Sequence, residues 1–348
     1  MRRRATVLGA VVGMMAAFIV TATPAQAHAD FVRMFDEPIM TPSLRGYDKL
    51  AITSPSVVRL DGVYHMVYAG FRLRTVQLLG ATSTDGIRWT KRRDPVLEPD
   101  SDRRWMNMGV AEAELRRGSD GVFYLFFTGL GPNDARAIGI ARSTGGPFGP
   151  WVVNPKPIVQ RSGEFPKAIA PSVAVDPFGD GRALLYYSYT DQGEGVWGLR
   201  VATAREPFWN PSTSRWAEFS PANDDEPIVT PPQGSSIGDA AIVMEDGVFY
   251  LFFTCLTHDE GSLIGLLTVH LATCEATSTS GLEFVNDSPA RVFSPRRAPA
   301  WDENVETPFV MKDGPGRYLM WYVGYRGNVL NPAAFYGASI GLASSPTL

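Results

Sequence analysis

Histidine and cysteine are scarce in this sequence, and their scarcity narrows the chemistry to consider. The 348 residues include only 4 histidines and 2 cysteines. No group of them has the spacing of zinc ligands. The chain also lacks the Gly-x-Ser-x-Gly motif of a serine hydrolase and a phosphate-binding glycine loop. The sequence therefore indicates neither a zinc site, nor a nucleophilic serine, nor a nucleotide site.

An excess of positive charge is also missing. The formal net charge is −4 at pH 7, which disfavours binding to nucleic acid. Beyond the first 27 residues, no segment is long and apolar enough to span a bilayer. We therefore expect neither nucleic acid nor a membrane span among the interactions of this chain, and we expect a monomer.

The first 27 residues have the pattern of a secretory signal peptide. A basic stretch, Arg2 to Arg4, precedes an apolar run from Val7 to Val20 and the small-residue site Ala25-Gln26-Ala27. The run is shorter than the roughly 20 residues of a membrane helix, and no stop-transfer pattern follows. An uncleaved anchor is the alternative. We predict cleavage after Ala27 and a secreted protein.

A repeated hairpin signal follows in the rest of the chain. Each copy is an Asp-Gly pair followed by an aromatic-rich strand and preceded by a short β-rich run. Asp-Gly between two such runs is the strongest local signal for a β-hairpin, because both residues tolerate positive φ. Five copies occur, at Asp61-Gly62, Asp120-Gly121, Asp180-Gly181, Asp246-Gly247 and Asp313-Gly314.

Four strands per copy at a spacing of about 60 residues predict a five-bladed β-propeller. A two-sheet sandwich with coincidental hairpins is the alternative. We expect one domain over residues 28–348. The last blade lacks a fourth strand, and the motif at residues 35–42 is expected to supply it and close the ring. The predicted blades span about 50–99, 107–160, 167–231, 236–295 and 303–348.

The two cysteines, Cys255 and Cys274, fall at the ends of successive antiparallel strands in this scheme. Corresponding ends of antiparallel neighbours lie far apart, because each residue adds about 3.3 Å. The blade scheme therefore argues against a disulfide, unless a loop rearranges.

The residue that opens the innermost strand of each blade should lie on a ring around the propeller axis. Counting back seven from the hairpin Asp gives Ser54, Asp239 and Glu306, and insertions shift the equivalents to Glu112 and Ala170 in the second and third blades. Clustered carboxylates repel one another and lose solvent, which raises the pKa of at least one of them. Glycoside hydrolysis needs such a pair, one carboxylic acid and one carboxylate.

Asp239, Glu306 and Glu112 are therefore the candidate catalytic residues. They have two alternative roles: to cap backbone amides of the inner strands, or to hold a structural cation. No cofactor is expected, and a structural calcium on the axis is left open.

Further residues on the same face are candidates for substrate binding. Trp301 and Trp105 offer flat apolar surfaces on which a sugar ring could stack, although tryptophans at these positions also pack blades. Asp302, beside Trp301, is a candidate for hydrogen bonds to the sugar. The loops after the second strand of each blade carry cationic side chains. These could bind sugar hydroxyls or an anion, or they could be solvated without a function. These are Arg72, Arg74, His258 and Arg326.

The blade phrase resembles that of the five-bladed glycosidase superfamily, which includes glycoside hydrolase families 43, 32, 68, 62, 117 and 130. The resemblance lies in Ser54-Pro55-Ser56-Val57-Val58 with Asp61-Gly62, in the stretch Gly80 to Thr90 (GATSTDGIRWT), and in Asp94-Pro95-Val96-Leu97. It covers essentially all of residues 28–348.

The resemblance implies a propeller that acts on carbohydrate. Family 43 enzymes have acids in blades one, three and four; here those positions are Ser54, Ala170 and Asp239, so an acid carries over at Asp239 alone. The fragment Trp105-Met106-Asn107-Met108 lacks the Asp of the family 32 motif.

We therefore expect a secreted, inverting glycoside hydrolase with Asp239 as base and Glu306 or Glu112 as acid. Two alternatives remain: a phosphorylase that binds phosphate through Arg72, Arg74 or Arg326, and a carbohydrate-binding propeller without activity.

Overall fold

A computed structural model describes residues 28–73, 75–160, 167–190, 197–229, 236–258, 269–327 and 332–348. Within these ranges the chain forms β-strands and three short 3-10 turns, and no α-helix. The predicted all-β class is confirmed. Residues 1–27, which carry the predicted signal peptide, and Arg74 lie outside the described residues. No helix in the described ranges is long and apolar enough to cross a membrane.

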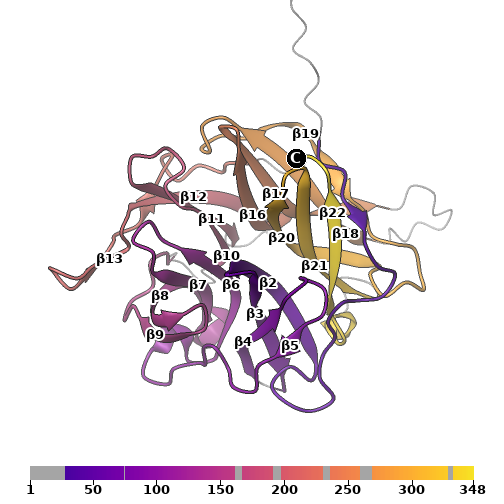
Figure 1. Cartoon of the computed structure of the whole chain (residues 1–348), viewed down its shortest axis with the longest axis horizontal. Helices are drawn as coiled ribbons and strands as arrows, with labels where there is room; N and C mark the ends of the chain where they lie inside the picture. The colour runs from indigo at the N-terminus through magenta and orange to yellow at the C-terminus, as the bar shows by residue number, and fades with distance from the viewer. Residues whose placement is uncertain are drawn as a thin grey trace, which may run out of the picture.

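The strands form units that succeed one another along the chain (Figure 1). A parallel bridge between Arg136 and Lys167 joins the second and third units into one eight-stranded sheet. The first unit holds β2 (Ala51–Leu60), β3 (Val63–Arg72), β4 (Thr75–Ser83) and β5 (Thr90–Lys91); the second holds β6 (Gly109–Arg117), β7 (Phe123–Leu130), β8 (Arg136–Gly146) and β9 (Gly149–Val153). The third holds β10 (Lys167–Ala174), β11 (Arg182–Thr190), β12 (Trp197–Arg205) and β15 (Ser220–Pro221). A small separate hairpin pairs β13 (Trp209–Asn210) with β14 (Arg215–Trp216).

The fourth unit holds β16 (Ile237–Glu245), β17 (Val248–His258), β18 (Val269–Ser278) and β19 (Val285–Phe293). The last holds β20 (Asn304–Gly314), β21 (Arg317–Tyr325), β22 (Ser339–Ser345) and β1 (Val32–Arg33). The first strands of the units contact one another in cyclic order, β2 to β6, β6 to β10, β10 to β16, β16 to β20 and β20 back to β2. Their labels surround the centre of Figure 1.

Two of the five Asp-Gly pairs have the backbone that their sequence predicts. Asp61 and Gly62 have φ values of 49° and 81°, and Asp246 and Gly247 have 49° and 79°. Positive φ at both central residues is the requirement of the two-residue hairpin turn whose twist matches the strands. In the other three pairs the Asp does not have positive φ, although Gly121 and Gly181 do, at 78° and 77°.

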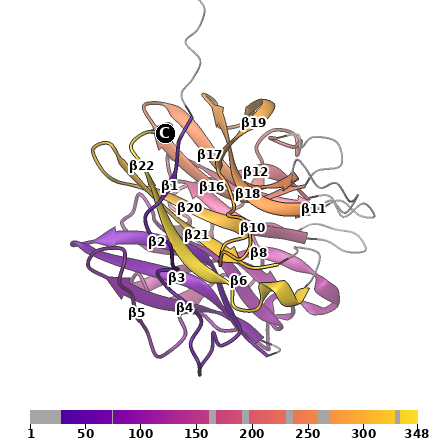
Figure 2. The same cartoon turned by 90° about the vertical axis from the view of Figure 1, so that its right-hand side faces the viewer.

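The N-terminal segment pairs with the last strand of the sequence. β1 is antiparallel to β22, and Met40 makes a further bridge to Ile340 (Figure 2). Met40 lies in the predicted fourth-strand motif. The same motif makes equivalent bridges in three other units, Leu97 to Leu78, Val159 to Ile138 and Val229 to Leu199.

The expectation that Cys255 and Cys274 are too far apart is wrong, because they form a disulfide. β17 runs on to His258, so Cys255 does not end its strand. Cys255 lies opposite Ala272, and Phe253 lies opposite Cys274. The two cysteines are thus diagonal neighbours across the strand pair, with their Cα atoms 5.9 Å apart.

Candidate active site

Each inner strand contains one residue in a left-handed backbone conformation near its start. The register of the strand pair shifts at that point, which frees the backbone N–H of the residue from the ladder. Left-handed backbone is rare outside glycine and marks functional or strained positions. We call these five residues the ring: Ser54 (φ 50°), Glu112 (50°), Ala170 (50°), Asp239 (54°) and Thr307 (46°).

The assignment of Glu306 to the ring is corrected by this geometry, because the ring residue of the last unit is Thr307. Counting seven back from the hairpin Asp assumes hairpins of equal length. In the first unit Leu60 pairs with Val63, whereas in the last unit Gly314 pairs with Arg317 after an additional register shift. The turn of the last hairpin is therefore Pro315-Gly316, and Asp313 lies on β20 only six residues after Thr307, so Glu306 directly precedes the ring.

The Glu112 carboxylate joins the second unit to the third. Its Oε2 accepts hydrogen bonds from the Thr128 hydroxyl at 2.7 Å and from the backbone N–H of Ala170 at 3.1 Å. The same N–H also reaches the Thr128 hydroxyl oxygen at 3.1 Å. Glu112 therefore caps the ring amide of the next unit, one of the alternative roles set out above, and remains partly exposed.

Asp239 repeats this arrangement between the fourth and last units. Its carboxylate accepts hydrogen bonds from the Thr254 hydroxyl and from the backbone N–H of Thr307. The Thr307 N–H also lies 3.0 Å from the Thr254 hydroxyl oxygen. The backbone N–H of Asp239 itself donates to the Ser188 hydroxyl at 2.9 Å.

Glu306 completes the acidic group. The Tyr325 hydroxyl donates to its Oε2 at 3.5 Å, and its backbone pairs with Val323 on β21. Burial and the charges of Glu306 and Asp239 raise the pKa of Tyr325, so this phenol stays protonated as a donor.

The three carboxylates interact electrostatically. Burial, together with the charge of Glu112, raises the pKa of Asp239 to about 7. Burial and the charges of Asp239 and Glu112 raise the pKa of Glu306 to about 8. Glu112 and Asp239 line one small cavity together with Thr307, the neighbour of Glu306, so the acids singled out from the sequence lie around the same axis. Near neutral pH this cluster holds protons that ordinary carboxyl groups would have lost.

A second layer closes the axis beneath the ring. The buried Glu114 accepts hydrogen bonds from the hydroxyls of Ser56 and Ser172 and pairs with Arg116 at 2.6 Å. The Arg116 guanidinium lies over the ring of Phe309. The cavity between the two layers measures about 30 Å³, which holds a water molecule or two and no sugar ring. A substrate would therefore have to contact the ring from the face opposite Glu114.

The two tryptophans pack the blades in the same way. Trp105 stacks on Phe127 and donates from Nε1 to the Pro155 carbonyl at 3.3 Å. Trp301 stacks on Tyr322 and donates from Nε1 to the carbonyl of Asp36 at 2.8 Å. Pro155 and Asp36 each lie two residues before the proline of a fourth-strand motif. Both indoles therefore anchor fourth strands, and both keep partial exposure.

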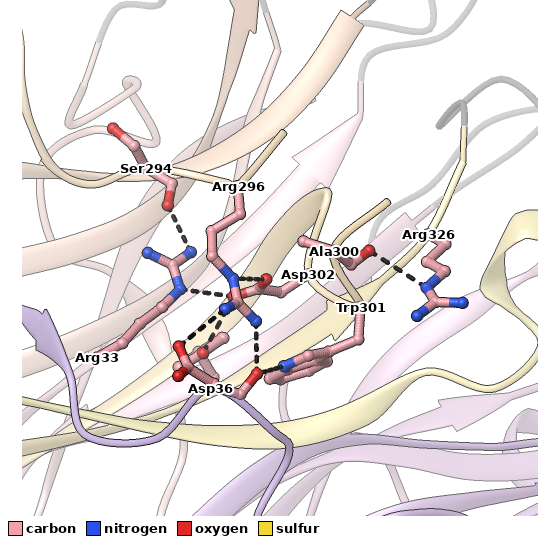
Figure 3. Close-up of polar contacts among 9 residues, drawn as sticks. Arg33, Asp36, Ser294, Arg296, Ala300, Trp301, Asp302 and Arg326 are labelled. Atoms are coloured by element: carbon pink, nitrogen blue, oxygen red, sulfur yellow. Dashed lines mark hydrogen bonds and ion pairs between the residues drawn. The ribbon is translucent and has the colours of Figure 1, made fainter. Parts of the chain in front are cut away.

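Asp302 is an internal ion-pair centre, so its carboxylate is not available to a sugar. It is 0% exposed. Arg33 and Arg296 each donate from Nε to it at 2.6 Å (Figure 3). The Tyr322 hydroxyl also donates to it at 3.2 Å. Arg33 comes from the N-terminal segment, 269 residues away. The substrate role expected for Asp302 is replaced by a structural one.

Two of the predicted cations, Arg72 and Arg326, are exposed at the surface. Arg72 is exposed at the end of β3 and lines a hollow with Phe71 and Tyr336. Arg326 is exposed and donates from Nε to the Ala300 carbonyl at 3.3 Å (Figure 3). His258 ends β17, and its side chain is outside the described part of the structure. None of these cations has a described contact with the three carboxylates.

Sequence reasoning missed the hydroxyls that hold the ring. The hydroxyl oxygens of Thr128, Ser188 and Thr254 each accept a hydrogen bond from the backbone N–H of the ring residue in the next unit. Each follows its hairpin Asp by eight residues, on the second strand of its unit. A Ser or Thr at that fixed offset was the available signal. Among the described residues, no group of three or more His, Cys, Asp or Glu has an arrangement that would hold a metal ion.

The sequence matches no family model. No curated protein matches it in sequence.

Solved structures, in contrast, resemble the chain over most of its length. The BT0996 RGII complex superposes with a TM-score of 0.65 at 17% identity, covering 91% of this chain and 92% of the other. A thermostable family-43 glycoside hydrolase gives 0.59 at 14% identity, covering 85% and 92%. A structure from the GH130 family, described as mannoside phosphorylases and glycoside hydrolases that target β-1,2-mannosidic linkages in Candida mannan, gives 0.62 at 14%, covering 92% and 95%. The resemblance noted from the blade phrase is confirmed at the level of the fold: the chain has the propeller-type fold of these glycosidases.

Proposed function

We propose that this chain is a five-bladed propeller glycoside hydrolase that is exported and acts on an extracellular oligosaccharide or polysaccharide. The observation that carries the proposal is the convergence of Glu112, Asp239 and Glu306 at the ring, with the pKa values of Asp239 and Glu306 raised toward neutrality. Similar folds in glycoside hydrolases support it. Cyclic contacts among the five inner strands support the blade count.

Glu306 is the proposed general acid, and Asp239 the proposed base. The acid must hold a proton that the base has already lost, and Glu306 has the higher pKa of the two. Across a ring, carboxyl groups leave room for a water between them, which favours inversion of the anomeric centre. Glu112 contributes the negative charge that raises both pKa values.

The decisive test compares two variants with the unmodified protein. Asp239→Asn and Glu306→Gln should each lower hydrolysis of the best substrate by about 10²-fold or more. The control is Asp180→Asn in the hairpin of the third unit, an exposed carboxylate paired with Arg182. If Asp239→Asn and Glu306→Gln both hydrolyse the substrate at the rate of the unmodified protein, the proposal is refuted.

Two other functions fit parts of the same structure. Binding without hydrolysis is favoured by Ser54 and Ala170, the ring positions without an acid, and by the amide-capping role of Glu112. Glycan binding without release of reducing ends would support it.

Phosphorolysis needs a cation near the ring. A requirement for phosphate that is lost in Arg72→Gln or Arg326→Gln would support that function.

A further inference from the structure

A separate hollow lies on the second unit. It is bounded by the 3-10 turn at Arg104–Met106 and the turn between β7 and β8, and it has a volume of about 440 Å³. We call it the Arg104 pocket. Its polar and aromatic lining consists of Arg104, Trp105, Asn133, Arg136 and Gln160.

The Arg104 pocket has a rigid aromatic wall. Gly129 and Gly139 leave the space that the Trp105 indole occupies, because a Cβ added at either would lie 2.4 Å or less from it. Phe127 stacks against the indole at a centroid distance of 5.6 Å. A sugar that packs on the exposed part of Trp105 would therefore meet a surface that needs no rearrangement.

The charge of the Arg104 pocket is opposite to that of the whole protein. Arg104 and Arg136 line it, and no acidic side chain does so among the described residues. Arg104 is exposed and has no ion-pair partner in the described ranges. The Asp134 carboxylate pairs with the Arg136 guanidinium and with the Lys167 ammonium group. One negative charge is therefore shared by two positive charges, which leaves a net positive charge beside the pocket. The complete sequence carries −4, so this positive charge is local.

The pocket lies at some distance from the ring. Arg136 pairs with Lys167 on β10, and Lys167 precedes the ring residue Ala170 by three positions. At about 3.3 Å per residue, this places the edge of the pocket roughly 10 Å from the ring along the strand. A single sugar ring held at the carboxylates would not reach it, whereas a chain of sugars would.

We propose that the Arg104 pocket binds an anionic sugar residue of an oligosaccharide, through charge-assisted hydrogen bonds from Arg104 and Arg136 and packing on Trp105. Planar guanidinium groups match the carboxylate of a hexuronic acid, and a sulfate ester offers the same chemistry. The proposal rests on the proposed function, because it identifies the substrate as an acidic oligosaccharide rather than a small neutral glycoside.

The test is calorimetric binding to the full-length protein and to its Asp239→Asn variant, so that no turnover is needed. The probes are tetragalacturonate, tetramannuronate, the neutral carboxyl-reduced tetragalacturonate, and a κ-carrageenan tetrasaccharide that carries sulfate. We expect a uronate probe to bind at least tenfold more tightly than the reduced one, and less tightly at high salt. Binding of the carrageenan probe alone would identify a sulfate ester as the anion.

Arg104→Gln and Arg136→Gln should each weaken binding of the acidic probe about tenfold or more, since both lose a charge-assisted hydrogen bond. The matched control is Arg88→Gln, whose side chain is 90% exposed and pairs with Asp85. Absence of binding to every acidic probe, or binding unaffected by both pocket variants, would overturn the proposal. Binding through Arg104 without any hydrolysis would keep the pocket and reject the hydrolase; hydrolysis of neutral glycosides alone would do the reverse.

Discussion

The carboxylate of Glu112 accepts a hydrogen bond from the backbone N–H of Ala170, 3.1 Å away in the next unit. The bond ties a candidate catalytic group to the backbone bulge that forms the ring. The same three-way arrangement of carboxylate, hydroxyl and amide recurs at Asp239, Thr254 and Thr307. The acids of the site are thus held by the structure that also joins the blades.

Hydrolysis should depend on pH through both acids. The proposed base acts when ionised and the proposed acid when protonated, so kcat/KM should be largest between the two pKa values, about 7 and about 8. Rates measured from pH 5 to pH 10 on an unactivated glycoside give the profile. A flat profile over this range would contradict the assignment of acid and base.

Stability should fall as pH rises through the same range. The pKa values of Asp239 and Glu306 rise from ordinary values of 3.8 and 4.5 to about 7 and 8, so the folded protein holds more protons than the unfolded protein from about pH 4 to pH 8. The unfolding free energy therefore declines across this range. The double variant Asp239→Asn, Glu306→Gln should show a smaller decline in Tm than the unmodified protein; equal declines would contradict the raised pKa values.

The Thr254 hydroxyl should influence the acidity of Asp239. Its hydrogen bond lowers the pKa of that carboxyl group, against the larger effects of burial and of Glu112. Thr254→Val should therefore move the acid limb of the pH–rate profile upward by roughly half to one pH unit.

Thr254→Ser should restore the profile, because it keeps the hydroxyl. Ser188→Ala is a useful comparison, since the Ser188 hydroxyl accepts from the backbone N–H of Asp239. A profile that Thr254→Val leaves in place would assign this hydroxyl a purely structural role.

The disulfide between Cys255 and Cys274 should stabilise the fourth unit. It closes a sequence separation of 19 residues. Loop-closure entropy predicts a gain of about 3 kcal/mol in unfolding free energy for a loop of this size. Denaturant unfolding with and without a reducing agent measures it, and the double variant Cys255→Ala, Cys274→Ala should not respond to the reducing agent.

Asp302 should be essential to the attachment of the N-terminal segment. Asp302→Asn leaves Arg33 and Arg296 facing each other without their shared anion, which should cost about 3–5 kcal/mol in unfolding free energy. Arg88→Gln at an exposed pair should change stability by less than about 1 kcal/mol. If Asp302→Asn melts like the unmodified protein, the ion-pair centre does not hold the segment.

The sequence alone was sufficient for the features that depend on a few adjacent residues. Asp-Gly pairs favour tight turns between strands, and Asp61-Gly62 and Asp246-Gly247 have positive φ at both residues, so the repetition of the pair predicted the hairpins and the all-β fold. The acidic residues near the starts of the inner strands followed from the same count, and Glu112 and Asp239 lie on the ring.

Tertiary structure decided everything that depends on register and on remote partners. The turn of the last hairpin lies at Pro315-Gly316 rather than at Asp313-Gly314, so the count from Asp313 gave Glu306 instead of Thr307, and only the strand register reveals this. Arg33 converts Asp302 from a candidate sugar ligand into a buried ion-pair centre across 269 residues. Local backbone preferences act over a few residues, whereas burial, charge coupling and strand register arise only when distant segments pack together.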